Sequence, residues 1–340
     1  MAGLWQRLYA AAHALRARWY RQRAGRLPRP VVSIGNLHWG GTGKTPLVAA
    51  VAGHLQRRGL AVCILSRGYG GSGRGTRLVS RGDGPLLAPE VAGDEPVLLA
   101  TLLPGVAIVV DGDRRRGGNA ALRLLSPPPD LFLLDDGFSH LRLHRDIDLL
   151  VFPAGDPLGG GRLWPGGRLR EPLAAASRAS AALLTGAGGP DIRTGLTAAL
   201  RARGFSGPVF AAPTRTGRAI LHSREGVVPL AAGSRVLLVS AIGRPERFAA
   251  AVRELDFAVM GELRFPDHHA YPAASLARIR DSLASAGADV VLATAKDRVK
   301  LLGRLAAPLA ELPIAAEPEA AFWTWLDGAV TALRSGGAAR

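Results

Sequence analysis

The sequence of 340 residues contains one cysteine, Cys63, and no long uninterrupted apolar stretch. A single thiol excludes an internal disulfide and any four-thiolate zinc site, which fits a reducing cytoplasm. The longest nearly apolar run covers residues 97–110, and Pro104 and Gly105 interrupt it. Because a helix that spans a bilayer needs about twenty apolar residues, we expect that no segment crosses a membrane.

Lysine is also scarce, and acidic residues are missing from one end of the chain. Of 43 basic residues only Lys44, Lys296 and Lys300 are lysines, which raises the question of why these positions need an ammonium group. The first 30 positions hold seven arginines and no acid, within a net charge of +16. This local excess differs from the uniformly basic character of many nucleic-acid binders, and we expect no nucleic-acid partner.

The basic N-terminal arm carries a helical pattern. Apolar residues recur at spacings of three and four, namely Leu4, Trp5, Leu8, Ala12, Leu15 and Trp19. The pattern predicts an amphipathic helix from about Leu4 to Tyr20. Aromatic residues flanked by arginines are typical of a helix that lies in a membrane interface, where anionic headgroups attract the cations. The alternative is a helix that packs on its own domain.

A glycine-rich loop follows the apolar run Pro30–Gly35 and precedes a helical pattern over Pro46–Arg58. Strand, loop and helix form the context of a P-loop, in which backbone N–H groups converge on phosphate oxygens. Lys44 supplies a charge to the β and γ phosphates, and the Thr45 hydroxyl can bind Mg²⁺. The predicted nucleotide-binding residues are His38, Trp39, Gly40, Gly41, Thr42, Gly43, Lys44 and Thr45. His38 stands where the strict pattern has glycine.

Two carboxylates end another apolar run. Leu131–Asp135 is followed by Asp136, as expected for a Walker B strand beside a P-loop. One of these two aspartates can hold Mg²⁺ near Thr45, and the sequence leaves open which one.

Further polar segments accompany the P-loop, and together they resemble the tetraacyldisaccharide 4′-kinases, the lipid A kinases of Gram-negative bacteria. The matching segments are Ser33–Leu37 with Gly40–Pro46, Leu65–Gly70, Gly93–Pro96, Asp135–Phe138 with His140, Leu169–Pro172, Asp267–His269 and Thr294–Asp297. They follow the order of that family over residues 31 to about 302. Ser139 and Ala295 depart from it, because the family commonly has glutamine and an acidic residue there.

The resemblance implies transfer of phosphate from ATP, with Mg²⁺, to the 4′-hydroxyl of a tetraacylated glucosamine disaccharide 1-phosphate, which gives lipid IVA. It also implies a peripheral enzyme on the cytoplasmic face of the inner membrane, which favours the interfacial interpretation of the arm. A four-chain lipid cannot leave the bilayer easily, since each exposed CH₂ costs about 0.8 kcal/mol. Nothing in the sequence indicates an obligate protein partner.

The same resemblance suggests roles for individual residues. Asp94 is the expected general base, because the sugar hydroxyl must lose a proton as the new bond forms. His268 or His269 is expected to reach Asp94 when the two units close, and Lys44 completes the catalytic set. The expected metal ligands are Thr45, Asp135, Asp136 and Glu95. The expected contacts to substrate or phosphate are Arg67, Tyr69 and Arg170. Residues 267–269 could alternatively be metal ligands or a solvated turn.

Apolar runs that alternate with helical patterns predict an α/β fold with a P-loop NTPase-type, mainly parallel sheet and helices on both faces. We expect the kinase domain at residues 30–207, after the arm at 1–29. A hairpin-like linker at 208–233 would join it to a smaller second α/β domain at 234–340. Its last helix, about Glu319 to Arg334, could pack on either unit.

A regulatory P-loop ATPase or GTPase of the partitioning or metallochaperone kind is the competing interpretation. Such proteins often carry a second lysine directly before the Gly-Gly pair. This chain has Trp39 at that position, which argues against that class.

Overall fold

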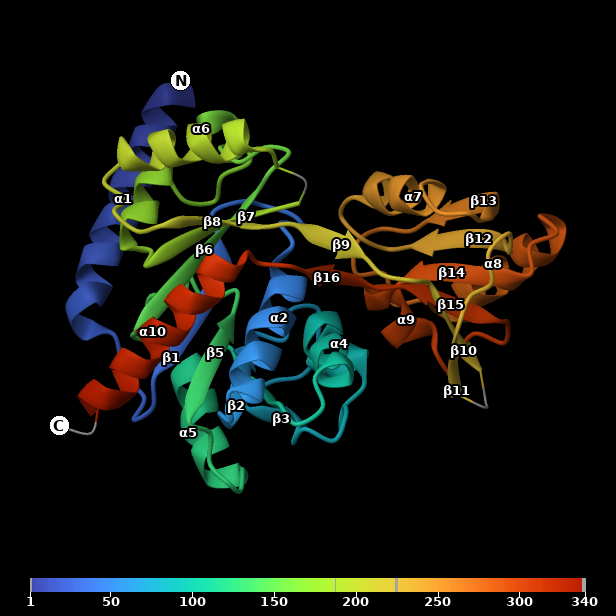
Figure 1. Ribbon diagram of the computed structural model, residues 1–340, viewed down its shortest axis with the longest axis horizontal. Helices are drawn as coiled ribbons and strands as arrows, with labels where there is room; N and C mark the ends of the chain where they lie inside the picture. Colours follow the sequence, from blue (N-terminus) through green and yellow to red (C-terminus); the bar gives the residue numbers. More distant parts are fainter. Residues whose placement is uncertain (1, 187, 224–225, 338–340) are drawn as a thin grey trace.

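The computed structural model describes residues 2–186, 188–223 and 226–337, and it contains two α/β units joined by a short two-stranded ribbon (Figure 1). Arg224 and Glu225, which belong to the predicted hairpin, lie outside the described residues. The side chains of Leu4 and Trp5 do so as well. None of the helices in the described ranges is long and apolar enough to cross a membrane.

The first unit is built on an eight-stranded sheet. In spatial order its strands are β3 (Arg77–Ser80), β4 (Ala107–Val110), β2 (Val62–Ser66), β5 (Leu131–Asp135), β1 (Val31–Asn36), β6 (Ile147–Pro153), β7 (Ala181–Thr185) and β8 (Val209–Ala212). β3 is antiparallel to β4, and the other pairs are parallel. The chain moves from β1 to β2 on one side and from β5 to β6 on the other. β1 therefore lies at a switch point, where ligands of α/β sheets bind beyond the strand ends.

Helices cover both faces of this sheet, as predicted. α2 (Lys44–Arg57), α4 (Asp94–Leu102) and α10 (Ala320–Gly337) pack on one face. The other face is covered by α5 (Arg114–Leu124), α6 (Pro190–Arg201) and the 3₁₀ segment η2 (Leu173–Arg178). The short segments α3 (Pro89–Ala92) and η1 (Gly159–Gly161) lie in loops. α1 (Ala2–Arg23), drawn in blue, runs along the outside of this unit (Figure 1).

The second unit is a six-stranded sheet. Its spatial order is β11 (Gly226–Pro229), β10 (Ile220–Ser223), β15 (Leu309–Leu312), β14 (Val290–Thr294), β12 (Arg235–Ser240) and β13 (Ala258–Arg264). α7 (Pro245–Arg253) packs on one face. α8 (Ala273–Ser285) and α9 (Ala295–Leu301) pack on the other.

The chain enters and leaves the second unit through one ribbon, formed by β9 (Thr214–Thr216) and the antiparallel β16 (Ile314–Ala316). Residues 208–233, expected to be a linker, contain β10 and β11. These strands extend the second sheet, since β10 pairs with β15 and β11 pairs with β10. α10, for which the sequence left both units open, returns to the first unit, where Phe322, Leu326 and Val330 enter the core. Its apolar periodicity could have served either sheet, so the pattern did not decide between them.

Candidate active site

The glycine-rich loop leaves the carboxyl end of β1 and leads into α2. Gly43 caps the helix with φ +78°, a left-handed conformation that glycine adopts without steric cost. Two strands hold Thr42: the Asn36 side-chain amide donates to Thr42 Oγ1 over 2.8 Å, and Thr185 Oγ1 donates to the Thr42 carbonyl over 2.7 Å. Half-buried Thr45 lies in the first turn of α2, whose free N–H groups and dipole favour an anion.

The predicted loop residues differ in their surroundings. His38 is 3% exposed and meets Phe152 edge-on at 6.0 Å, and burial lowers the pKa of His38 to about 4. It therefore packs as a neutral core side chain. Trp39 is 56% exposed, and a Cβ atom added at Gly40 or Gly41 would meet no other atom within 4 Å.

The Asp136 carboxylate pairs with two basic side chains. Lys44 Nζ lies 3.2 Å from Asp136 Oδ1 and donates to Asn36 Oδ1 over 3.0 Å. The Arg170 guanidinium donates to both Asp136 oxygens and to Asn36 Oδ1. Burial alone would raise the pKa of Asp136, but Lys44 and Arg170 hold it well below its ordinary range. Asp136 is thus an ionised carboxylate that orients the P-loop lysine.

Asp135 has the opposite environment. It is 7% exposed and accepts a hydrogen bond from Ser66 Oγ over 3.0 Å. Burial, together with the negative charges of Asp136 and Glu95, raises the pKa of Asp135 to about 6. A bound cation would relieve this concentration of negative charge.

The donor set fits Mg²⁺, which is usually held by one or two carboxylates together with substrate phosphates. Asp135, Glu95 and the Thr45 hydroxyl supply oxygen donors of this kind at one edge of the first sheet. Within the described ranges, no group of three or more His, Cys, Asp or Glu side chains could hold a metal ion by itself.

Asp94 is the first residue of α4, directly after Gly93. Gly93 has φ +92°, and a side chain there would come within 2.5 Å of the Tyr69 carbonyl, so only glycine fits. The N-terminus of a helix favours the charge of Asp94. Burial by itself would raise the pKa of Asp94, but the hydrogen bond with His268 and the charge of Lys300 lower it below its ordinary value.

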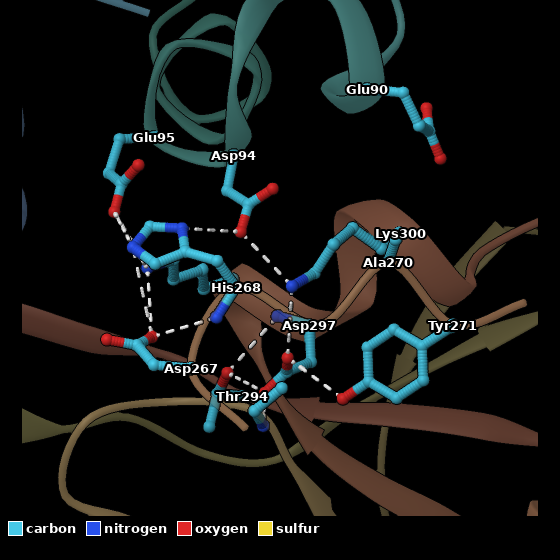
Figure 2. Close-up of polar contacts among 12 residues, drawn as sticks. Glu90, Asp94, Glu95, Asp267, His268, Ala270, Tyr271, Thr294, Asp297 and Lys300 are labelled. Atoms are coloured by element: carbon cyan, nitrogen blue, oxygen red, sulfur yellow. Dashed lines mark hydrogen bonds and ion pairs between the residues drawn. The ribbon is translucent and has the colours of Figure 1, made fainter. Parts of the chain in front are cut away.

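The second unit brings one of the two predicted histidines to this carboxylate. Figure 2 shows the His268 ring beside Asp94, with Nδ1 3.2 Å from Asp94 Oδ2. The Lys296 ammonium lies 3.2 Å from Nε2. Since an ammonium cannot accept a hydrogen bond, the neutral ring accepts through Nε2 and donates through Nδ1 to Asp94. The bond with Asp94 raises the pKa of His268 against burial and the charge of Lys296.

The other predicted side chains are distributed around this pair. His269 lies apart from Asp94, since its Nε2 is 2.8 Å from Ser275 Oγ and its ring stacks on Phe265. Glu95 forms an ion pair with Lys296 at 2.7 Å. The Tyr69 ring meets His268 at 5.2 Å and is 64% exposed. Arg67 is exposed directly after β2.

Comparison with known proteins decides the family. The chain matches the family described as Tetraacyldisaccharide-1-P 4′-kinase over residues 4–331. The chain belongs to this family. A tetraacyldisaccharide 4′-kinase of Geobacter sulfurreducens is 43% identical over 307 residues, which cover 89% of this chain and 82% of the relative. One of Pelobacter propionicus is 41% identical over 310 residues, which cover 87% and 81%.

A solved structure agrees with this assignment to the 4′-kinase family. The crystal structure described as the "apo" form of LpxK from Aquifex aeolicus in complex with ATP superimposes with a TM-score of 0.76. It is 31% identical and covers 97% of each chain. The family and the P-loop α/β fold predicted from the sequence are therefore confirmed, and these similarities do not favour the regulatory ATPase or GTPase.

Sequence reasoning missed two charged residues of this 4′-kinase family site. Arg114 is 4% exposed, burial lowers its pKa, and its charge acts on Asp135 and Asp136. Its position just after β4 was the available signal. Lys300 contacts Asp94, and its rarity as a lysine was the only indication.

Proposed function

We propose that this chain transfers the γ-phosphoryl group of ATP to the 4′-hydroxyl of a tetraacylated glucosamine disaccharide 1-phosphate. The observation that carries the proposal is the contact between Asp94 of α4 and His268 of the second unit, next to a P-loop whose lysine is held by Asp136. The family supplies the substrate class, and this contact supports a base close to the phosphates.

Phosphoryl transfer requires mainly positioning and neutralisation of charge. Lys44 and the loop N–H groups would bind the β and γ phosphates. Mg²⁺, held by Thr45, Asp135 and Glu95, would neutralise charge on these phosphates when bound.

Asp94 would accept the proton of the 4′-hydroxyl while that oxygen bonds to the γ phosphorus. The bond from the γ phosphorus to the bridging oxygen breaks, and ADP leaves. His268 would donate from Nδ1 to Asp94 and keep it oriented. Tyr69 and Arg67, at the exposed side of this site, would contact the sugar or its phosphate, whereas Arg170 would act through Asp136.

α1 would bring the enzyme to the anionic cytoplasmic face of the inner membrane. One side of the helix docks on the first unit, since the Tyr9 hydroxyl donates to the Arg170 carbonyl over 3.1 Å and His13 lies 3.4 Å from Glu171. Leu8, Leu15 and Trp19 remain 58%, 68% and 51% exposed. Exposed apolar residues on a basic helix are typical of interfacial binding, and α1 adjoins the segment that supplies Arg170.

The test is transfer of labelled γ-phosphate from ATP to the disaccharide 1-phosphate in detergent micelles, with Lys44→Ala as the control. We expect a labelled 4′-phosphate product, and a loss of rate on the order of 10² to 10³ in the control. ATP hydrolysis without any labelled lipid would overturn the proposal in favour of a regulatory ATPase.

A further inference from the structure

Lys300 lies between Asp94 and a buried polar cluster of the second unit. Its Nζ is 3.1 Å from Asp94 Oδ2 and 3.6 Å from Asp297 Oδ1 (Figure 2). The side chain is 2% exposed, and the Tyr271 ring centroid lies 5.3 Å from Nζ. The ammonium therefore connects a carboxylate of each unit in a space closed to solvent.

Asp297 is a rigid support for this ammonium. It is fully buried, and its Oδ1 accepts a hydrogen bond from the Tyr271 hydroxyl over 3.0 Å. Its Oδ2 accepts from the Thr294 hydroxyl over 2.7 Å and from the Ala241 N–H over 3.0 Å. Donors on both oxygens fix the orientation of a buried carboxylate. Lys300 thus extends from a fixed point of the second unit to the first.

Asp94 receives both contacts from the second unit on one oxygen. Lys300 and His268 approach Oδ2 at 3.1 and 3.2 Å. Oδ1 accepts no hydrogen bond from the residues described, and in Figure 2 the second oxygen of Asp94 points away from both partners. Charge-assisted bonds to one oxygen fix the rotation of the carboxylate. The other oxygen is left for an incoming hydroxyl.

We propose that Lys300 is a positioning residue that orients Asp94 so that Oδ1 meets the 4′-hydroxyl, with Asp297 and Tyr271 as its support. The inference rests on the proposed function, in which Asp94 is the base. A compact ammonium with three donors suits a closed space between two carboxylates, whereas a planar guanidinium requires a wider site. This accounts for a lysine in a chain whose 43 basic residues are nearly all arginine.

The test compares Lys300→Met and Lys300→Arg in the full chain, with ATP and the disaccharide 1-phosphate in micelles. Lys300→Met should lower kcat about tenfold or more, because misplacing a reacting group is costly, while KM for ATP changes less than about twofold. Lys300→Arg should keep a higher kcat than Lys300→Met, since it retains charge and donors. A purely steric role predicts the reverse order, because arginine would overfill a closed space that methionine fits.

A matched control removes another ion pair of the same interface. Glu90 and Arg304 pair at 2.9 Å, with the Glu90 side chain 47% exposed. If Lys300 acts on Asp94 and not by holding the two units together, Glu90→Gln should leave kcat within about twofold of wild type.

Double variants separate this inference from the proposed function. In an Asp94→Asn background, Lys300→Met should lower kcat by less than about twofold, because Lys300 then has no base to orient. A wild-type rate in Lys300→Met, or an undiminished further loss in the Asp94→Asn background, would overturn the inference alone. If the wild-type enzyme transfers no label to the lipid, the proposed function would be overturned instead.

Discussion

At the scale of the residue, Asp135 and Asp136 are neighbours in the chain, yet their surroundings separate their pKa values. Asp136 faces Lys44 and Arg170, which hold its pKa low. Asp135 is buried near two other carboxylates, and its pKa rises to about 6. Groups with pKa values driven apart in this way are commonly assigned different roles. Asp136 orients the P-loop lysine, and Asp135 is the carboxylate that a cation would stabilise.

This separation predicts a pH-dependent effect of Asp135→Asn on the free energy of unfolding. The folded-state pKa of Asp135, about 6, lies above its unfolded value, so wild-type stability falls as pH rises from about 4 to 6 and is then level. Asparagine does not ionise. As the pH rises from 4 to 7, the free energy of unfolding of the variant should therefore increase by on the order of 3 kcal/mol relative to that of the wild type.

Denaturant unfolding of both proteins across this range, without nucleotide, checks this expectation. A difference in stability that stays constant with pH would contradict the burial argument. Asp136→Asn is the matched control, and it should destabilise the protein at pH 7 because Lys44 and Arg170 lose their carboxylate.

The surroundings of the two histidines predict different kinetics for their variants. His268→Asn should lower kcat, since the ring contacts Asp94, whereas His269→Asn should leave kcat near wild type, because His269 faces Ser275. Combined with Asp94→Asn, the His268 change should be less than additive. Steady-state rates of the single and double variants measure this. Equal losses from both histidines would indicate that His269 also reaches the substrate.

At the scale of the element, two sides of α1 differ in their surroundings. Tyr9 and His13 contact residues 170 and 171 of the first unit. Leu8, Leu15 and Trp19 are exposed among arginines. The two interpretations left open by the sequence, a packed helix and an interfacial helix, thus concern opposite sides of one helix.

Replacing Leu8, Leu15 and Trp19 together by glutamine should therefore weaken binding to anionic vesicles and leave the thermal midpoint nearly unchanged. Wild-type binding should weaken with salt, because each arginine near the surface contributes about 1 kcal/mol that salt screens. It should persist in part through the apolar contacts. Co-sedimentation and thermal unfolding give the two readouts. Unchanged vesicle binding with a lowered midpoint would show that these side chains stabilise the fold.

Several elements could be predicted from sequence because their signals are local. The apolar runs of β1 and β5 and the glycine loop before α2 lie close to their predicted positions. The partners of Asp135, Asp136 and Asp94 come from distant segments, so no local pattern could reveal which aspartate is paired with cations. Which of the two histidines contacts Asp94 depends on the backbone turn at His268, which has φ +62°.

At the scale of the whole molecule, the second unit is an insertion between β8 and α10 of the first. Thr216 of β9 pairs with Ile314 of β16, and the Gly217 N–H donates to the Pro313 carbonyl over 2.8 Å. The insertion thus begins and ends at adjacent points of one ribbon. The P-loop and Walker B carboxylates belong to the first unit, whereas His268 and Lys300 reach Asp94 from the second.

This arrangement predicts that the nucleotide site survives removal of the second unit. Residues 217–313 can be replaced by Asn-Gly, the two-residue turn that best joins antiparallel strands, so that β9 and β16 become a hairpin and α10 keeps its place in the first core. The shortened protein should fold and bind ATP, yet transfer no phosphate to lipid, because Asp94 has lost both partners. Calorimetric titration with ATP tests the expected binding, and the labelled-transfer assay tests the expected loss of transfer. Lys44→Ala in the shortened chain is the non-binding control. Loss of ATP binding in a folded product would mean that the second unit also shapes the P-loop.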